Sequence, residues 1–568
     1  MKAFTEPLLS LAGFEEMTKT AEKSSGLISV TGCIDAQKSQ MIYAFGGHRK
    51  NKLIVTFGEQ KAKELYDEYS FFDKEVVYYP SKDVLFYQSD IRGNLLTAER
   101  IRALKAIREQ ERVTLVTTFD ALMNTMAPIE KMWENVLTLE QGQLLDLKEI
   151  QAALIRMGYE KEYQVQTMGQ FSVRGGILDV FPLTEENPIR IELWGDEIDT
   201  IRYFDCESQK SIENIDRVSI YPAAELVLSD EEKAGGIEKL KAEAKRVSDK
   251  LRKQMKTEEA HRVTVMADEL TEEWGELSMY AGMDAFLSYF FDERVGILDY
   301  FKPSDSLIFF DELTRCTEQG KLTETEFSES MKQRLAMGYI LPGQMNGLFT
   351  EKEIVAKLGK YSCIALAALD NKANGLHQLG SYGIHCQSVS PYNNSFELLI
   401  KDLKRYKKNG YRVILLSGSR TRAKRLSEDI TDQGITCFYT ENYDHELFEG
   451  QIMVCYGKVR RGFEYPILKF AVITESDIFG AQQKKKKRHR TYEGEKIQSF
   501  TDLSVGDYVV HENHGLGIYR GIEKLEVDKK VKDYIKIEYQ GGSNLYILAT
   551  QLDMIQKYAG KDARKPKL

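Results

Sequence analysis

A segment near the N-terminus has the residue types that bind phosphate groups. Residues 32–39 read GCIDAQKS, which fits the pattern G-x-x-x-x-G-K-[ST] except that Gln37 replaces the second glycine. Such a loop turns backbone N–H groups toward a phosphate, and a side chain at the glycine position obstructs that approach. Gly32, Lys38 and Ser39 are retained, so the sequence predicts a former nucleotide site that Gln37 has made non-functional.

A pair of acidic residues could have completed such a site. Asp311 and Glu312 follow the apolar run 306–310, and a carboxylate at a strand end can hold a magnesium-bound water. Many buried strands end in acids, so the pair is informative only together with residues 32–39. The two segments suggest the halves of one former ATPase domain, separated by inserted sequence. We expect no catalytic residue and no metal site in this chain.

The elements that would position these residues alternate between strand and helix. Residues 26–58 form a predicted β-α-β unit, and the alternation continues to residue 135. This pattern predicts the first part of a doubly wound α/β domain, of degenerate phosphate-loop type, over residues 1–135. The chain is expected to return to it over residues 223–345, through a long amphipathic helix and a strand at 306–310.

Further domains interrupt and follow this first one. Residues 136–222 show a period of two with glycine turns, which is typical of a small inserted α+β domain. Residues 346–480 alternate again and predict a second α/β domain that includes a strand at 363–366. Short strands split by glycines predict a small SH3- or Tudor-like β-barrel over residues 498–560. A basic linker (481–497) and a short tail (561–568) complete this predicted α/β multidomain chain.

Composition limits the class of protein. With 568 residues and about 100–200 residues per domain, three to five domains are expected. The net charge of −9 disfavours wrapping on DNA, because phosphate binding needs neutralising cations. Seven scattered cysteines without a C-x-x-C pair indicate a reducing compartment. No signal peptide or long apolar run is seen, so we expect a cytoplasmic protein that does not cross a membrane.

The insert carries a specific resemblance to known families. Residues 169–182 read GQFSVRGGILDVFP, residues 190–198 read RIELWGDEI, and Phe204 and Asp205 follow. This segment resembles the one shared by the excision-repair helicase UvrB and the transcription-repair coupling factors. In both families it belongs to the domain that docks on the damage-recognition protein UvrA. The resemblance therefore implies UvrA as a partner of residues 136–222.

The C-terminal region distinguishes between the two families. Residues 505–519 read VGDYVVHENHGLGIY, and with the strands at 534–539 and 545–547 they are similar to the polymerase-interacting barrel of the coupling factor, a relative of CarD-type regulators. UvrB has no such barrel. The chain thus resembles a bacterial transcription-repair coupling factor, which implies a scaffold that recognises stalled RNA polymerase through its β subunit and recruits UvrA.

The same resemblance indicates what we expect this chain to lack. Coupling factors continue into a helicase-like motor, an ATP-dependent DNA translocase that displaces polymerase, and this chain stops at Leu568. We therefore expect ATP, Mg²⁺ and most contacts to double-stranded DNA to belong to the absent motor, with no cofactor in this chain. The basic run KKKKRHR at 484–490 is either a solvated linker or a contact to nucleic acid or polymerase.

By resemblance, three residues of the insert match the positions that hold UvrA: Arg174, Arg190 and Trp194. Trp194 stands where the family often has phenylalanine, which keeps a flat apolar contact. Arginines beside an aromatic residue are frequent interface anchors. The alternative interpretation is that both arginines brace the sheet through carboxylates such as Glu192 or Asp196.

The resemblance also implies how the barrel binds RNA polymerase, by setting a strand edge beside a strand of the β subunit. Our candidate edge is residues 522–527, with Leu525 as the apolar anchor and Ile522 and Lys524 beside it. The alternative is that Leu525 fills the barrel core, since alternation places Glu526 on the opposite face.

Two other function classes stay open at this point. A helicase of UvrB type needs an intact phosphate loop, and Gln37 opposes it. A CarD-like regulator with an unrelated front end does not account for residues 169–205. His511 and His514 lie three residues apart without further metal ligands, so a packing role is favoured for them. Of the three classes, the coupling scaffold accounts for both ends of the chain.

Overall fold

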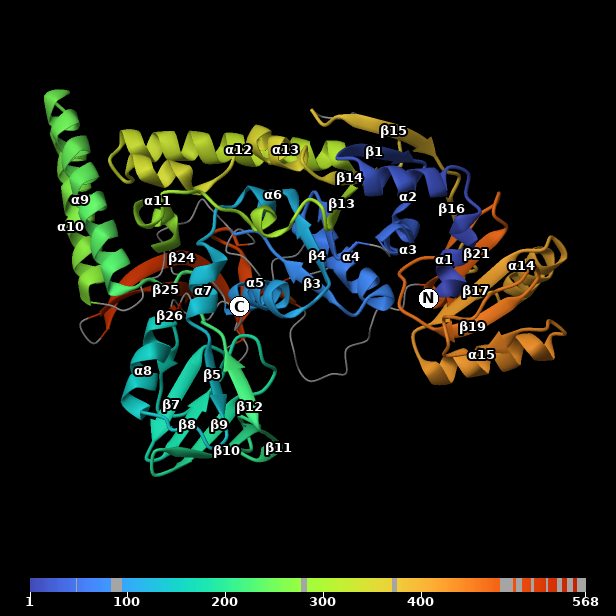
Figure 1. Cartoon of the computed structure of the whole chain (residues 1–568), viewed down its shortest axis with the longest axis horizontal. Coiled ribbons are helices and arrows are strands. Elements are labelled where there is room, and N and C mark those ends of the chain that lie inside the picture. The colour runs from blue at the N-terminus through green and yellow to red at the C-terminus, as the bar shows by residue number, and fades with distance from the viewer. Residues whose placement is uncertain are drawn as a thin grey trace.

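The computed structural model describes residues 1–46, 49–82, 94–276, 283–369, 375–480, 494–496, 503–511, 515–527, 530–538, 544–548 and 555–558. Its first α/β domain is built on a seven-stranded sheet in which every neighbouring pair is parallel (Figure 1). Across the sheet, the strands are β15 (Gln378–Gly383), β1 (Gly26–Thr31), β14 (Ser362–Leu366), β13 (Ser306–Asp311), β2 (Asn51–Thr56), β4 (Val113–Thr118) and β3 (Val76–Tyr79).

The central strands are short apolar runs because helices cover both faces of the sheet. β13, for example, reads SLIFFD and is buried along its whole length. The return strand predicted at 306–310 pairs in this sheet, with Ser306 opposite Asn51 of β2. The predicted α/β architecture with a parallel sheet is therefore confirmed.

One boundary of the prediction is wrong. The strand at 363–366, assigned from the sequence to the second α/β domain over 346–480, is β14, and it lies between β1 and β13. β15 pairs with β1 in the same sheet, so the first domain extends to Gly383. A short apolar strand has no local feature that specifies which sheet it joins, and this explains the error.

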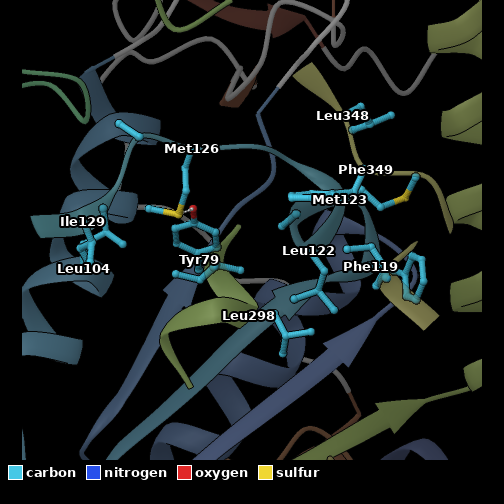
Figure 2. Close-up of a cluster of buried hydrophobic side chains, with 14 of the residues drawn as sticks. Tyr79, Leu104, Phe119, Leu122, Met123, Met126, Ile129, Leu298, Leu348 and Phe349 are labelled. Atoms are coloured by element: carbon cyan, nitrogen blue, oxygen red, sulfur yellow. Dashed lines mark hydrogen bonds between the residues drawn. The ribbon is translucent and has the colours of Figure 1, made fainter. Parts of the chain in front are cut away.

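The helices of the first domain pack on opposite faces of its sheet. One face is covered by α1 (Lys2–Leu9), α2 (Phe14–Lys23), α3 (Asp35–Phe45) and α4 (Glu59–Phe72). The other is covered by α5 (Asn94–Glu109), α6 (Phe119–Met123), α7 (Ile129–Glu134), α11 (Leu287–Phe290), α12 (Leu313–Ala336) and α13 (Glu351–Leu358), with short 3-10 helices at Met283–Phe286, Ile297–Tyr300 and Pro342–Gly347. Figure 2 shows the buried side chains of the second face, where Phe119 and Met123 lie close to Phe349.

A helical hairpin projects beside this domain (Figure 1). It consists of α9 (Asp230–Lys253) and α10 (Thr257–Glu276). Ser229 starts α9 with a reciprocal cap, because its hydroxyl accepts the Glu232 N–H while the Glu232 carboxylate accepts the Ser229 N–H. The long amphipathic helix predicted for this region is therefore present.

The insert has a core of its own. Its main sheet contains, in order, β11 (Ser211–Ile215), β10 (Glu197–Phe204), β9 (Ile189–Trp194), β8 (Ile177–Val180), β7 (Gln170–Arg174) and β6 (Glu160–Lys161). A second pair is formed by β5 (Leu137–Glu140) and β12 (Arg217–Ile220), and the helix α8 (Leu147–Arg156) begins after the capping residue Asp146. Leu154, Phe171 and Ile191 belong to this core, which is separate from that of the parent domain.

A buried ion pair fixes the insert to the first domain where the chain leaves it. The Arg100 side chain on α5 is fully buried, and its Nε donates to Glu225 at 2.6 Å. Lys82 binds the same carboxylate at 3.0 Å. Burial raises the pKa of Glu225, but the charges of Arg100 and Lys82 outweigh this effect and lower it to about 2. Glu225 is therefore ionised at neutral pH and joins the insert to α5.

The second α/β domain has a six-stranded sheet with helices on one face. Its strands are, in order, β16 (Gln387–Ser388), β20 (Phe463–Tyr465), β21 (Phe470–Thr474), β17 (Arg412–Ser417), β19 (Ile452–Tyr456) and β18 (Phe438–Tyr439). The helices α14 (Phe396–Lys408) and α15 (Arg420–Asp432) cover one face, and α16 (Glu475–Phe479) follows β21. On the other face Ile414 and Met453 share a core with Phe4 and Leu65, so the two α/β domains are packed together.

The C-terminal region is an antiparallel sheet. In order, its strands are β22 (Gly494–Lys496), β27 (Ile555–Tyr558), β23 (Tyr508–His511), β24 (Gly515–Val527), β25 (Lys530–Glu538) and β26 (Asn544–Leu548). Val509, Tyr519, Ile535 and Ile537 form its small core. The closed barrel stays a prediction. Most of the basic linker 481–497, His514 and the tail 561–568 lie outside the described residues.

Candidate functional site

The outward face of the insert's main sheet carries the residues predicted to bind a partner. Strand β9 alternates, with Ile189 and Ile191 in the core and Arg190 and Trp194 on the opposite face. The strand register places Asp179 of β8 directly opposite Arg190. Alternation and register therefore bring an acid and an arginine together on a face that the core does not cover.

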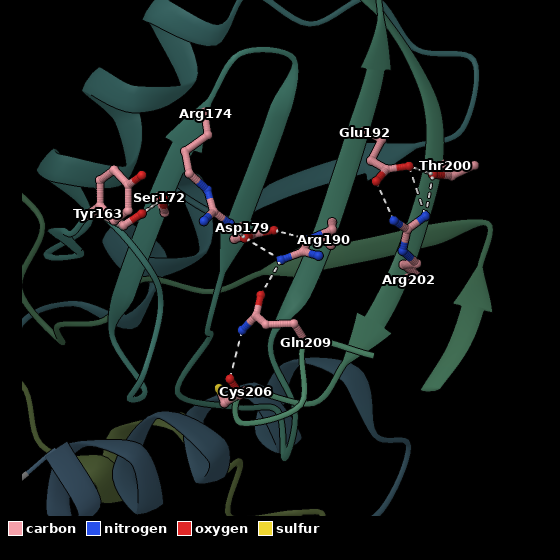
Figure 3. Close-up of polar contacts among 10 residues, drawn as sticks. All are labelled: Tyr163, Ser172, Arg174, Asp179, Arg190, Glu192, Thr200, Arg202, Cys206 and Gln209. Carbon is pink, nitrogen blue, oxygen red and sulfur yellow. Dashed lines mark hydrogen bonds and ion pairs between the residues drawn. The ribbon is translucent and has the colours of Figure 1, made fainter. Parts of the chain in front are cut away.

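Asp179 is the centre of this face (Figure 3). Its side chain is 1% exposed, and its two oxygens accept hydrogen bonds from Arg190 Nε at 2.7 Å and Nη2 at 2.9 Å. Arg174 Nη2 donates to the same carboxylate at 2.8 Å. A buried carboxylate is destabilising unless cations and donors satisfy it, so the two arginines and Asp179 hold one another in place.

The two arginines differ in how firmly they are held. Arg190 is 13% exposed, donates to Gln209 Oε1 at 2.8 Å, and lies over the Phe204 ring at 4.3 Å. Its hydrogen bond to Asp179 raises the pKa of Arg190, so the guanidinium stays charged. Arg174 makes its bond to Asp179 with 35% of its side chain exposed. Arg190 is thus mainly braced, whereas Arg174 is oriented and still accessible.

The bracing alternative considered from the sequence named the wrong carboxylates. Glu192 binds Arg202 Nη1 at 3.0 Å instead, and Thr200 donates to it at 3.3 Å. Asp179 was missed because it lies within the apolar run ILDV, where a lone acid resembles a strand-end residue. An acid at an outward position one strand from an arginine is the signal that could have identified it.

Trp194 ends β9 and is 83% exposed, which is unusual for a large aromatic side chain. It lines a shallow depression together with Glu140, Glu197, Asp199 and Asp216. An exposed ring beside charged groups is a common composition for a protein-binding anchor. Strand alternation and register place Arg174, Arg190 and Trp194, the three residues that the resemblance singled out, on one face of the sheet.

The segment with the phosphate-loop pattern has a different conformation from a phosphate cradle. Helix α3 begins at Asp35, so Gln37, Lys38 and Ser39 lie in its first two turns. Lys38 is 1% exposed, and its Nζ donates to Asp311 at 2.5 Å and to Glu312 at 2.9 Å. Although burial lowers the pKa of Lys38, the two carboxylates outweigh that effect and raise it. The lysine charge is therefore used inside the protein.

Other chain segments cover this loop. Gln37 is buried, and its Oε1 accepts a hydrogen bond from the Tyr465 hydroxyl of the second α/β domain at 3.0 Å. Gly32 has a φ of +77°, and a Cβ there would lie 2.0 Å from the carbonyl oxygen of Ile384. The backbone after β15 thus occupies the space above Gly32, where a phosphate would have to approach.

The predicted polymerase-binding edge lies on β24. Residues 522–527 pair with β25, and within the described residues β23 pairs with β24 over Gly515–Ile518 only. One edge of 522–527 therefore has no partner strand among the described residues. Ile522 packs against the core of this sheet, whereas the side chains of Lys524 and Leu525 lie outside the described set.

Neither a metal cluster nor a membrane span is found within the described part of the chain. No group of three or more His, Cys, Asp or Glu side chains there could hold a metal ion. No helix there is both long and apolar enough to cross a bilayer.

Comparison with family models identifies two regions. Residues 137–226 match the UvrB interaction domain, and residues 503–559 match the CarD-like/TRCF RID domain. These ranges coincide with the insert and the C-terminal sheet. Together they cover the two regions that carried the resemblance seen in the sequence.

Curated relatives extend the similarity along the chain. The transcription-repair-coupling factor of Bacillus subtilis is 31% identical over 518 residues, which is 91% of this chain and 43% of that protein. The factors of Staphylococcus haemolyticus and Staphylococcus aureus are 30% and 29% identical over 95% and 98% of this chain, or 46% and 47% of their own lengths. The chain therefore spans a little under half of the relatives that it matches.

Proposed function

Because the chain is similar to transcription-repair-coupling factors over nearly its whole length, we propose that it acts as the docking part of such a factor. In this proposal the insert binds UvrA and the C-terminal domain binds the β subunit of RNA polymerase. One chain then connects a stalled polymerase to excision repair. The two separate family matches, at residues 137–226 and 503–559, support this division of roles.

The observation that carries the UvrA part is the outward face centred on Asp179. That carboxylate fixes Arg190 and orients Arg174, and Trp194 is exposed on the same face. Preorganised arginine and aromatic side chains lose little conformational entropy on binding, so they can contribute strongly to affinity. We assign contact to Arg174 and Trp194, and a combined bracing and contact role to Arg190.

The polymerase part rests on residues 522–527 of β24, one edge of which has no partner strand among the described residues. Main-chain groups along residues 522–527 could extend a strand of the β subunit by β-addition. Because Ile522 packs against the core of its own sheet, its contribution to this contact would come through its backbone. Leu525 and Lys524 stay the proposed side-chain contacts.

We further propose that this chain holds no nucleotide. Lys38 is neutralised by Asp311 and Glu312, and the space above Gly32 is filled by backbone. ATP hydrolysis, Mg²⁺ binding, translocation and most double-stranded DNA contact would then be properties of the motor in the full-length relatives. A UvrB-type helicase activity for this chain is disfavoured on the same ground.

The central experiment is a pull-down of the chain with purified UvrA and RNA polymerase, separately and together. We expect each to bind alone, and both to be present in one complex. Trp194→Ala should reduce the amount of UvrA recovered and leave polymerase bound, whereas Leu525→Arg should reduce the amount of polymerase recovered and leave UvrA bound. If neither protein binds a chain with a native circular dichroism spectrum, the proposal fails.

Leu525→Arg needs a folding control because the residue could be in the core of its domain. Val509→Arg provides it, since Val509 is fully buried and an unpaired buried charge should unfold the domain. We expect Leu525→Arg to retain the wild-type melting profile. A profile like that of Val509→Arg would assign Leu525 to the core and reject residues 522–527 as the binding edge.

A further inference from the structure

The tip of the α9–α10 hairpin has an unusual charge distribution. Between residues 245 and 256 six cationic side chains are exposed, against one exposed carboxylate, Asp249. The six are Lys245, Arg246, Lys250, Arg252, Lys253 and Lys256. None forms an ion pair with any residue that the structure describes, although the chain as a whole has a net charge of −9. A concentration of unpaired positive charge is thus placed at the end of a projecting element.

The hairpin holds these charges rigidly. Buried Leu240, Ala244 and Leu251 seat α9 in the core, and the Ser248 hydroxyl donates to the carbonyl of Ala260 on α10 at 3.1 Å. Lys245 and Arg252 are seven residues apart, which places them on the same side of α9 and about 10 Å apart along its axis. Cations whose spacing is fixed by a helix lose little conformational entropy when they bind a rigid polymer with regularly spaced charges.

The turn between the helices departs from the usual residue choice. Met255 adopts a left-handed φ of +63°, a conformation that glycine adopts without strain and that methionine rarely does. Its side chain is 87% exposed, so packing does not explain the methionine. Strained backbone with an exposed apolar side chain is more common at binding sites than elsewhere.

We propose that this hairpin tip, residues 245–256, is a binding site for the phosphate backbone of double-stranded DNA. The lysines and arginines contact phosphates, and Met255 provides an apolar contact in the groove between them. The proposal does not depend on UvrA or polymerase binding. It gives this part of the molecule a DNA contact of its own, apart from the basic run at 484–490.

Fluorescence anisotropy with a labelled duplex of about 30 base pairs tests this site, using the whole chain at low salt. The test variant is Lys245→Glu/Arg252→Glu/Lys253→Glu. Its matched control is Lys302→Glu/Lys352→Glu/Lys360→Glu, which changes the charge equally at exposed lysines outside the hairpin. We expect the test variant to bind at least about tenfold more weakly, and the control to stay within about twofold of wild type.

The salt dependence gives a second readout that a general charge effect would not reproduce. Each lost phosphate contact should reduce the slope of log Kd against log salt by about 0.9, so the triple variant should lose about two to three. Met255→Gly should weaken binding by about twofold to fivefold while raising the midpoint of thermal unfolding. Unchanged binding by Met255→Gly would remove Met255 from the site.

Several results would overturn the proposal. These are undetectable duplex binding by the wild-type chain, an equal loss in the test and control variants, or an unchanged salt slope. Tighter binding to a single strand of the same length would reject the duplex assignment. Preferential binding to vesicles containing phosphatidylserine would assign the tip to a membrane surface instead.

Discussion

Asp311 in the first sheet and Asp179 in the insert are equally buried, and each binds cationic side chains. At Asp311 the single cation, Lys38, is 1% exposed, and Glu312 and Asp35 also bind it. At Asp179 one carboxylate holds two arginines, of which Arg174 is 35% exposed. An excess of acid encloses its cation, whereas an excess of cation leaves one available at the surface. Both aspartates are buried, so the ratio of acidic to cationic side chains decides the outcome. At Asp311 the cation is enclosed, which we call a closed site, and at Asp179 an arginine stays accessible at the surface, which we call a presenting site.

The strongest test of this comparison removes the enclosed cation. Lys38→Met leaves Asp311 and Glu312 without a counter-charge, and breaking a buried pair in this way is expected to cost about 3–5 kcal/mol. Urea denaturation at neutral pH measures the loss. Lys19→Met, which removes an exposed pair with Glu15, is the control and should leave the midpoint unchanged. A loss for Lys38→Met below about 1 kcal/mol would show that the cluster is not closed.

The pH dependence of stability tests whether water is excluded from the contact between the two α/β domains, beside the phosphate-loop segment. Glu68 lies where the two α/β domains meet, and its Oε1 accepts the Arg460 N–H at 3.3 Å. Burial raises the pKa of Glu68 to about 7, although the charge of Arg460 opposes this. The folded state therefore binds this proton more tightly than the unfolded state, whose pKa is near 4.5. The resulting stability is complete below pH 4.5 and is lost as pH rises to 7.

Replacing Glu68 with glutamine should remove this pH dependence. The total effect is at most roughly 3.5 kcal/mol, because the pKa rises from 4.5 to about 7 and each pH unit between the two values corresponds to about 1.4 kcal/mol. Urea melts of Glu68→Gln and wild type from pH 4.5 to 7.5 give the difference. Glu64→Gln, which removes the neighbouring partner of Arg460, is the control. If the free energy of unfolding of Glu68→Gln and of wild type depended on pH in the same way, water would have to reach Glu68 between the two α/β domains.

Substitutions on the face centred on Asp179 should affect UvrA affinity and the stability of the fold to different extents. Trp194→Ala and Arg174→Ala should each weaken UvrA binding by about 1–4 kcal/mol and leave the melting temperature nearly unchanged. Arg190→Ala should lose affinity and also about 1–3 kcal/mol of stability, because it removes two of the three arginine hydrogen bonds to buried Asp179 and the donor to Gln209 Oε1. Calorimetric titration with UvrA gives the change in affinity, and thermal melts give the change in stability. Equal melting losses for all three would make the whole face structural.

The smallest expected effect is the absence of nucleotide binding. Titration with ATP and Mg²⁺ should give no heat, and Gln37→Gly should not restore binding, because Lys38 stays bound to Asp311 and Glu312. A micromolar dissociation constant corresponds to about −8 kcal/mol and would be readily detected. Binding of that strength by either protein would contradict the closed interpretation of this site.

Sequence patterns were sufficient where local chemistry decides the structure. The inserted sheet follows from a period of two, the return strand at 306–310 from a short apolar run, and the C-terminal strands from short runs split by glycines. Arg174, Arg190 and Trp194 were selected by resemblance to the coupling-factor family, whereas their common face follows from the alternation and register of the strands in the structure. Gln37 was identified as the obstacle in the phosphate loop because a glycine position tolerates no side chain.

Long-range partners were beyond those patterns. Asp179 as the shared carboxylate depends on the register between β8 and β9, and Tyr465 reaches Gln37 from more than 400 residues away in sequence. The position of β14 in the first sheet likewise depends on pairing with strands that no local run specifies. Met255 was unremarkable in sequence, since only its backbone conformation sets it apart.

The order of strands in the first sheet has a consequence for how the protein is made. β2 lies between β4 and β13, and β13 begins at Ser306, so the centre of the sheet is incomplete for about 250 residues after β2 has been synthesised. At about 5–20 residues per second, that interval lasts roughly 10–50 seconds on the ribosome. The insert has its own core and is complete well before then. The growing chain therefore has an uncovered β2 edge at a time when the insert can already form its own core, and such unpaired strand edges make folding intermediates prone to aggregation.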